Sequence, residues 1–231
     1  MLVVCNGMPR SGSTYQYNLA RMVVRAAGLG VAHSYLDPGF NDMPGDGWPA
    51  EVFQEWIDDD AHHVVKMHEA HPVAVDALSD GHVRLLYIHR DIRDVAASLK
   101  RVRHRKADSL LERVERAVTL YYTFRDIRDA APDYVLWQRY EEAVLEPEEA
   151  TRQVAEFVGA SLSDSAIADI AQECSVDSAK KRCDTAQQQV VARFQEIRRQ
   201  DPAAAQVWLR QVQQGQRIVQ DTEFLLPHNH V

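Results

Sequence analysis

The chain has 231 residues, 45% of them hydrophobic and 26% charged, and a formal net charge of -8. This composition predicts one ordinary globular α/β domain over residues 1–231 and excludes a fibre or a wholly disordered chain. The acidic balance argues against nucleic acid or an anionic membrane surface as a partner, because both require a basic face. Any anion that the protein binds must therefore be held by local groups.

Four apolar, partly β-branched segments are predicted to be strands: 2–6, 63–67, 83–89 and 134–137. Helical patterns separate them, at 13–27, from Asp91 to Val102 and at 109–130, and the chain beyond 148 is expected to be helical. This alternation predicts a parallel β-sheet of four to five strands flanked by helices, with a helical C-terminal part. Ligands of such a sheet bind at the carboxyl ends of its strands.

The segment 35–49 is dense in Gly, Pro, Asp and Asn, which predicts a loop. It is either a lid or acceptor-binding element or a simple mobile connection, and the sequence leaves both open.

The cysteines Cys5, Cys174 and Cys183 lack the spacing of a metal site and are interpreted as structural thiols. The apolar start of the chain is too short for a signal peptide, and no segment approaches the ~20 apolar residues of a membrane span. We therefore expect a reducing, cytoplasmic location and no membrane span. The sequence leaves monomer and homodimer open.

The strongest motif is the segment 7–14, GMPRSGST, between the first strand and the first helix. Backbone N–H groups and the helix N-terminus converge at such a turn, which favours binding of a phosphate. A Walker A loop has lysine before its last Ser or Thr, but Ser13 occupies that position and the positive charge lies at Arg10. The shorter reach favours a nucleotide whose 5'-phosphate carries a single further group.

A second anion-binding pattern follows the third predicted strand. Arg90 stands at its carboxyl end, and Ser98 lies two turns along the next helix. An arginine fork and a hydroxyl donor can grip one anion, although an arginine before a helix is commonly part of a surface salt bridge.

Lys66 and His68 occupy alternating positions at the end of the second predicted strand, so both are expected on one face. A histidine near its ordinary pKa can take a proton from an attacking hydroxyl, and a nearby lysine can neutralise charge. We therefore predict His68 as the general base and Lys66 as its electrostatic partner. Glu69 and His71 are the alternative bases.

PRSGST resembles the 5'-phosphosulfate-binding loop of the sulfotransferases that use 3'-phosphoadenosine-5'-phosphosulfate (PAPS), whose usual form is P-[KR]-[ST]-G-[ST]-[ST]. The strand, Arg90, the DIRDV stretch and Ser98 resemble the family's 3'-phosphate element, and the K-x-H at 66–68 matches its catalytic pattern. The resemblance implies a P-loop NTPase-like fold and in-line transfer of the sulfuryl group to a hydroxyl or amine of a small-molecule acceptor. It also implies PAPS as cofactor, PAP as product and no metal.

The resemblance also assigns site residues. Arg10 would contact the bridging oxygen and the sulfonate, which makes it catalytic together with His68 and Lys66. Tyr140 lies in QRYEEAVLEP, which resembles the family's Y-E-D-L segment, and is expected near the adenine, with a plain helix start as the alternative. The cofactor-binding residues implied are Arg10, Ser11, Gly12, Ser13, Thr14, Tyr15, Arg90, Ser98 and Tyr140.

The chain departs from the family pattern near its end. Relatives carry a glycine-rich loop with Arg-Lys-Gly that completes the 3'-phosphate grip, whereas this sequence ends LLPHNHV. Either the sequence stops before that loop or another group substitutes, and the basic run with Lys180 and Lys181 is the best substitute. Two rival functions remain: a P-loop kinase or nucleotidase, which would need Mg²⁺, and a non-catalytic nucleotide-binding relative. The acceptor cannot be predicted from the sequence.

Overall fold

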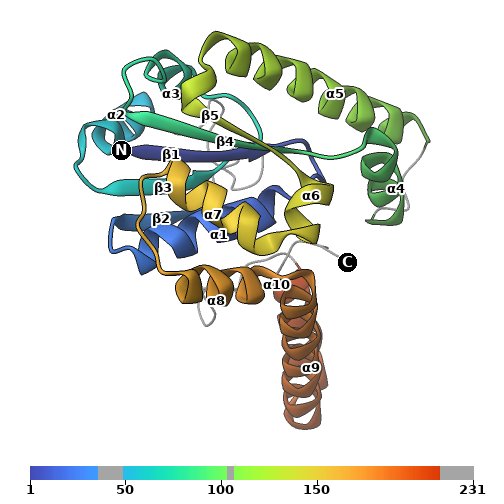
Figure 1. Cartoon of the computed structure of the whole chain (residues 1–231). Helices are drawn as coiled ribbons and strands as arrows, with labels where there is room; N and C mark the ends of the chain where they lie inside the picture. Colours follow the sequence, from blue (N-terminus) through green and yellow to red (C-terminus); the bar gives the residue numbers. More distant parts are fainter. Residues whose placement is uncertain (36–48, 103–106, 214–231) are drawn as a thin grey trace. The chain divides into compact units, whose positions relative to one another are not determined.

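A computed structural model describes residues 1–35, 49–102 and 107–213. Within these ranges five parallel strands form one sheet in the order β2-β3-β1-β4-β5, with β1 at its centre (Figure 1). The strands are β1 Leu2–Gly7, β2 Gly30–Tyr35, β3 His62–Lys66, β4 Val83–His89 and β5 Val135–Arg139. The predicted parallel sheet flanked by helices is confirmed.

The chain divides into two compact units, with the boundary between Cys174 and Ser175. The first unit contains the sheet and the helices α1 Ser13–Ala26, α2 Ala50–Asp58, α3 Pro72–Asp76, α4 Ile92–Val102, α5 Ala107–Ala130, α6 Tyr140–Leu145, α7 Pro147–Phe157 and α8 Asp164–Cys174, with the 3-10 turn η1 Pro132–Tyr134. The second contains α9 Val176–Gln200 and α10 Pro202–Gln213. A single domain over 1–231 stays a prediction. No helix in the described ranges has both the length and the apolar composition needed to cross a membrane.

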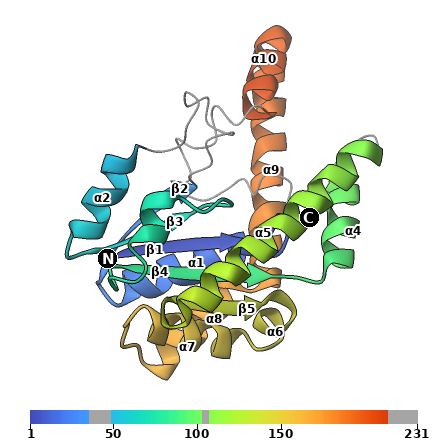
Figure 2. The same cartoon turned by 90° about the horizontal axis from the view of Figure 1, so that it is seen from above.

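The sheet is covered on both faces, and β1 shows why. All six of its residues are buried, and successive side chains point to opposite faces. Val3 and Cys5 pack with apolar residues of α1, α7 and α8, whereas Leu2 and Val4 pack with residues of α2, α3 and α5. Figures 1 and 2 show these two helical layers on either side of the sheet. A continuous apolar run is therefore what a central parallel strand requires.

Strand β2 is the strand that the sequence analysis did not predict. It lies at the edge of the sheet and pairs only with β3 among the described strands, and Val31 on it is 53% exposed. Its first residue must be small, because a Cβ on Gly30 would lie 2.0 Å from the carbonyl oxygen of His62. Close pairing with β3, rather than an apolar pattern, therefore defines this strand. The predicted loop 35–49 lies, from 36 to 48, outside the described residues.

Candidate functional site

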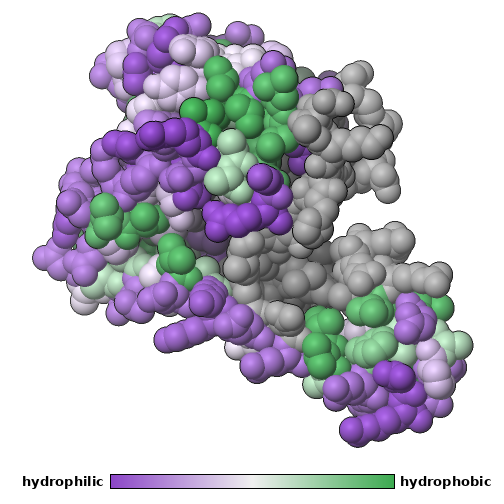
Figure 3. All heavy atoms as spheres, turned by 90° about the vertical axis from the view of Figure 1, so that its right-hand side faces the viewer, coloured by the Kyte–Doolittle hydropathy of each residue, from purple (hydrophilic) through white to green (hydrophobic). Residues whose placement is uncertain are grey.

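The predicted site residues of the first unit come from one edge of the sheet, where the parallel strands have their carboxyl ends. The phosphate loop follows β1, His68 follows β3, Arg90 follows β4 and Tyr140 follows β5. Figure 3 looks onto this side of the molecule, where hydrophilic surface and a group of hydrophobic side chains lie side by side. The edge agrees with the general position of ligand sites in such sheets.

The backbone of the loop takes the left-handed conformation twice, at Arg10 with φ 70° and at Gly12 with φ 92°. Gly12 is the N-cap of α1, no side chain caps this helix, and its first turn has no acidic residue. The first N–H groups of a helix have no intrahelical acceptor, and the helix dipole adds positive potential there. Ser13 and Thr14 lie in this first turn, so the loop provides an environment suited to an anion.

Two residues predicted to bind the nucleotide, Ser11 and Tyr15, use their hydroxyl groups in hydrogen bonds within the protein. The buried Ser11 hydroxyl lies 2.7 Å from the carbonyl oxygen of Met8 and 2.8 Å from that of Ile88, and donates its one proton to either. It therefore fastens the loop to β4. The Tyr15 hydroxyl donates to the carbonyl oxygen of Ala143 at 2.9 Å and ties α1 to α6. Direct nucleotide contacts by these two residues stay predictions.

Arg10 joins the phosphate loop to the second predicted anion element. Its Nε donates to the Oγ of Ser98 at 3.0 Å, across 88 positions of sequence. Burial lowers the pKa of Arg10, and the charges of Arg90 and Arg101 lower it further. A guanidinium group that lies near two other positive charges is stabilised when an anion binds beside it.

Arg101 was missed by sequence reasoning. The signal was its position three residues after Ser98, which places both on one side of α4.

Arg90 and Tyr140 pack against the loop. The Arg90 guanidinium lies 4.6 Å from the centre of the Tyr140 ring, and a Cβ at Gly12 would lie 2.3 Å from the Cδ2 of that ring. Arg90 also pairs with Asp94 at 3.5 Å, yet its buried Nε has no hydrogen-bond partner among the described residues. A buried N–H of a cation without an acceptor is costly, and an anionic ligand would supply one. The residues present therefore fit a nucleotide with two phosphate positions.

His68 is oriented by the same strand that carries the loop. Its Nδ1 lies 3.0 Å from the carbonyl oxygen of Gly7. Because a carbonyl only accepts, Nδ1 carries the proton, and in the neutral ring Nε2 is the basic nitrogen. Lys66, 8% exposed, is the last residue of β3 and pairs in register with Cys5. Since β3 ends there, backbone contacts rather than strand alternation place His68.

The two alternative bases have other surroundings. Glu69 forms an ion pair with Arg116 of α5, with 2.5 Å between Oε1 and Nη2, and both side chains are largely exposed. His71 stacks on Phe53, with ring centroids 4.0 Å apart.

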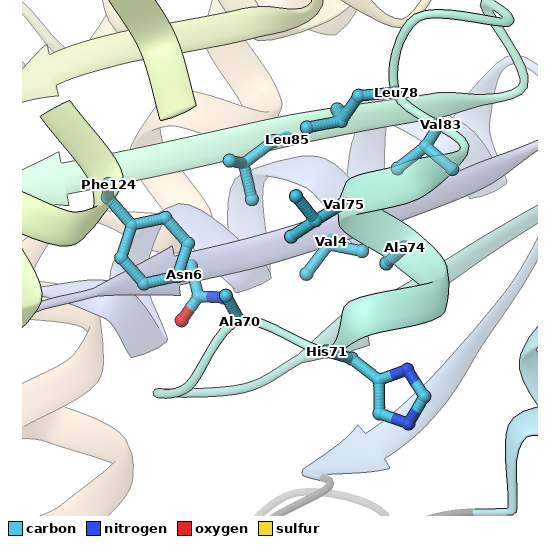
Figure 4. Close-up of a pocket in the computed structure, with 10 residues that line it drawn as sticks. All are labelled: Val4, Asn6, Ala70, His71, Ala74, Val75, Leu78, Val83, Leu85 and Phe124. Atoms are coloured by element: carbon cyan, nitrogen blue, oxygen red, sulfur yellow. The ribbon is translucent and has the colours of Figure 1, made fainter. Parts of the chain in front are cut away.

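A small cavity adjoins His71, lined mostly by apolar side chains from β1, β4, α3 and α5 (Figure 4). Its volume of about 10 Å³ is far below the ~300 Å³ of a small ligand pocket. The cavity therefore belongs to the core rather than to an acceptor site.

The predicted basic substitutes Lys180 and Lys181 lie in the second unit. Both are residues of α9, whose N-cap Ser175 accepts a hydrogen bond from the backbone N–H of Ser178 at 3.2 Å. Both side chains are exposed. Their contribution to nucleotide binding stays a prediction.

A glycine-containing loop at the centre of a parallel sheet, between its central strand and the next helix, is the arrangement of the P-loop NTPase-like fold. The family model of the sulfotransferase domain matches residues 2–201, and the chain therefore belongs to the sulfotransferase family.

One solved structure supports the fold, and a second is similar over a comparable share of the chain. Mouse sulfotransferase SULT7A1, complexed with PAP, is similar with a TM-score of 0.56 and 17% identity, over 78% of this chain and 65% of that one. Retinol dehydratase, in complex with androsterone and the inactive cofactor PAP, has a TM-score of 0.47 and 19% identity, over 75% of this chain and 64% of that one. The chain thus spans slightly less than two thirds of either protein. A search of curated protein sequences found no match.

Proposed function

We propose that the chain transfers the sulfuryl group of PAPS to a hydroxyl or amine of a small-molecule acceptor, with His68 as general base. The observation that carries this proposal is the hydrogen bond between His68 and Gly7, the residue at which the phosphate loop begins. It holds a base with a defined tautomer beside the site best suited to a phosphosulfate. Membership of the sulfotransferase family supports the same reaction class.

The loop is the proposed site of the 5'-phosphosulfate. When bound, PAPS supplies an activated sulfuryl group that leaves its 5'-phosphate behind. The N–H groups of Gly12, Ser13 and Thr14 at the start of α1 hold that phosphate, and Arg10 neutralises charge that develops on the leaving oxygen. The hydrogen bond from Arg10 to Ser98 fixes the direction of the guanidinium before ligand binds.

The second basic element is the proposed site of the 3'-phosphate. Arg90 offers its buried Nε, and Ser98 a hydroxyl on the adjacent helix. Tyr140, which packs against Gly12 and Arg90, lies between the two phosphate positions and is proposed to contact the nucleoside. Lys180 and Lys181 are proposed to contribute positive charge to nucleotide binding.

His68 accepts the acceptor's proton at Nε2 while Nδ1 keeps its bond to Gly7. The imidazolium formed then still donates to the Gly7 carbonyl, which stabilises it. Lys66 compensates negative charge on the transferring group from its buried position at the end of β3. The residues thus provide acid–base chemistry and charge stabilisation with no metal in the proposed scheme. The cytoplasmic location stays a prediction from the sequence, as does the choice between monomer and homodimer.

Calorimetry with PAP tests the cofactor, with ATP and Mg²⁺ as the comparison ligand. We expect PAP to bind without metal and ATP to bind weakly, because Ser13 replaces the lysine that a Walker A loop offers to the β- and γ-phosphates. Binding of ATP with Mg²⁺ but not of PAP would contradict the proposal and favour a kinase.

His68→Ala tests the base, with Glu69→Gln as the matched control on the neighbouring residue. Sulfate transfer from radiolabelled PAPS to a panel of phenols, alcohols and amines should fall by about 10²–10⁴-fold in the first variant. The control should keep its rate, because the exposed Glu69–Arg116 pair contributes little. PAP affinity should stay within about twofold in both. A His68→Ala enzyme as fast as the wild type would exclude His68 as the base.

A further inference from the structure

The segment that carries His68 is fastened to the end of β1 at three successive residues. The N–H of Met67 donates to the carbonyl oxygen of Cys5 at 3.0 Å, and Nδ1 of His68 donates to that of Gly7 at 3.0 Å. Between these two bonds lies the side chain of Asn6, which is 0% exposed. The backbone of β1 thus supplies the first and last contacts, and a side chain supplies the middle one.

The Asn6 amide has one orientation that satisfies its surroundings. With Nδ2 turned toward the segment, it donates to the carbonyl oxygen of Met67 at 2.7 Å and to that of His68 at 3.3 Å. In the opposite orientation Nδ2 reaches the carbonyl oxygen of Glu69 at 3.3 Å, but the amide oxygen would face that of Met67 at 2.7 Å. Two acceptors at that distance repel each other, so we assign the first orientation. In both, the amide donates to the main chain of the His68 segment.

An amide is unexpected at this position on packing grounds. Side chains alternate along β1, so Asn6 lies on the face that Leu2 and Val4 fill with apolar packing. Figure 4 shows its amide between Phe124 and Ala70, at one end of the small apolar cavity. A buried amide stabilises a fold only when its hydrogen bonds are made, and an apolar side chain would satisfy the core equally well. The amide therefore serves the carbonyl groups of Met67 and His68.

We propose that Asn6 is a positioning residue for the base, an inference that rests on the proposed role of His68. Its amide holds the backbone of His68 where the ring can donate from Nδ1 to Gly7. That donation keeps the proton on Nδ1 and the lone pair on Nε2. Without the amide, the segment loses its middle contact, the ring no longer stays on Gly7, and the neutral ring populates both tautomers. A displaced base costs rate while the phosphate loop keeps its own contacts.

The test reads the tautomer of His68 directly. In ¹⁵N-histidine-labelled protein at pH 8.5, two-bond ¹H–¹⁵N correlation spectra distinguish the Nδ1–H from the Nε2–H form, and the His68→Ala spectrum identifies the His68 signals. Wild type should show the Nδ1–H form. Asn6→Leu, which keeps the approximate shape and removes the donor, should show a substantial Nε2–H population. Its transfer rate to phenols turned over by the wild type should fall by about 10–100-fold.

Two further variants keep the test decisive. Asn6→Ser has a smaller side chain, and its hydroxyl is one bond too short to replace the amide. If Asn6→Leu does not fold, Asn6→Ser should show the tautomer change in its place. Thr151→Val is the matched control. Thr151 is also 0% exposed, and its hydroxyl donates to the carbonyl oxygen of Pro147 at 2.7 Å, but it lies on α7 rather than on β1. It should lose stability without changing the His68 tautomer.

The outcomes separate this inference from the proposed function. A folded Asn6 variant with a pure Nδ1–H tautomer and the wild-type rate would overturn the role of Asn6 and leave His68 as base. A His68→Ala enzyme with full activity would overturn the proposed function itself. PAP affinity in the Asn6 variants should stay within about twofold, since loss of binding would mean that Asn6 supports the phosphate loop rather than His68.

Discussion

Replacing Gly12 by alanine should distort the phosphate loop and lower the free energy of unfolding, through backbone strain and through a clash that can be measured separately. Gly12 has a φ of 92°, in the left-handed region, where an L-residue costs about 1–2 kcal/mol. A Cβ there would also lie 2.3 Å from Cδ2 and 2.7 Å from Cε2 of the Tyr140 ring, so the ring must move. Forcing an extra methyl group into a packed site typically costs ~1–3 kcal/mol. We therefore expect Gly12→Ala to lower the free energy of unfolding by about 2–5 kcal/mol.

Two controls separate the strain from the clash. Gly28 has a φ of 65°, but a Cβ added there would meet nothing within 4 Å, so Gly28→Ala should show the backbone strain alone, about 1–2 kcal/mol. In a Tyr140→Ala background the clash at Gly12 disappears, and the cost of Gly12→Ala should fall to that same range. Urea denaturation followed by circular dichroism measures each of these differences. Equal costs of Gly12→Ala with and without Tyr140 would refute the contact between the ring and the loop.

Three shorter predictions concern the nucleotide and the pH response. Ser98→Ala removes the acceptor of the Arg10 guanidinium and should weaken PAP binding about 10-fold in calorimetry; an unchanged affinity would remove Ser98 from the nucleotide site. The double variant Lys180→Ala, Lys181→Ala should weaken PAP binding most at low salt, and equal affinity at every salt concentration would exclude both lysines. Burial lowers the pKa of His33 below its ordinary value, so the unfolded chain binds more protons and stability should fall as the pH decreases from about 7.5 to about 5.5. Urea denaturation of wild type and His33→Gln should show a smaller pH effect in the variant.

The elements predicted correctly are those with a local signal. The buried run of β1, the glycine turn after it and the start of α1 at Ser13 depend on neighbours in sequence, and the structure places them where they were predicted. Asp91 directly precedes α4, and its side chain accepts from the N–H of Arg93 at 2.9 Å, as a residue that caps the helix does. Strand β2 lacks such a signal, because its sequence GVAHSY is partly polar and its pairing with β3 is determined by tertiary structure.

The site was predictable as a set of motifs but not as a geometry. Arg10, His68 and Arg90 stand out because each follows a predicted strand. The bond from Arg10 to Ser98 and the use of the Ser11 hydroxyl to fasten β4 depend on contacts between residues far apart in sequence. No periodicity encodes such contacts, so the sequence indicated which residues matter and the fold determined which of them act on each other.

Asn6 shows how a local signal can be overlooked. As the last residue of a predicted apolar strand it looked like a strand end, yet it is buried on a face made of Leu2 and Val4. A polar residue in that position indicates a bond that the strand must make beyond its own ladder. Since Cys5 and Gly7 also bond the segment after β3, the end of β1 carries both the phosphate loop and the attachment of His68. Any shift of this strand end must therefore move the base and the phosphate site together, whereas the side chain of Asn6 can be changed for the base alone.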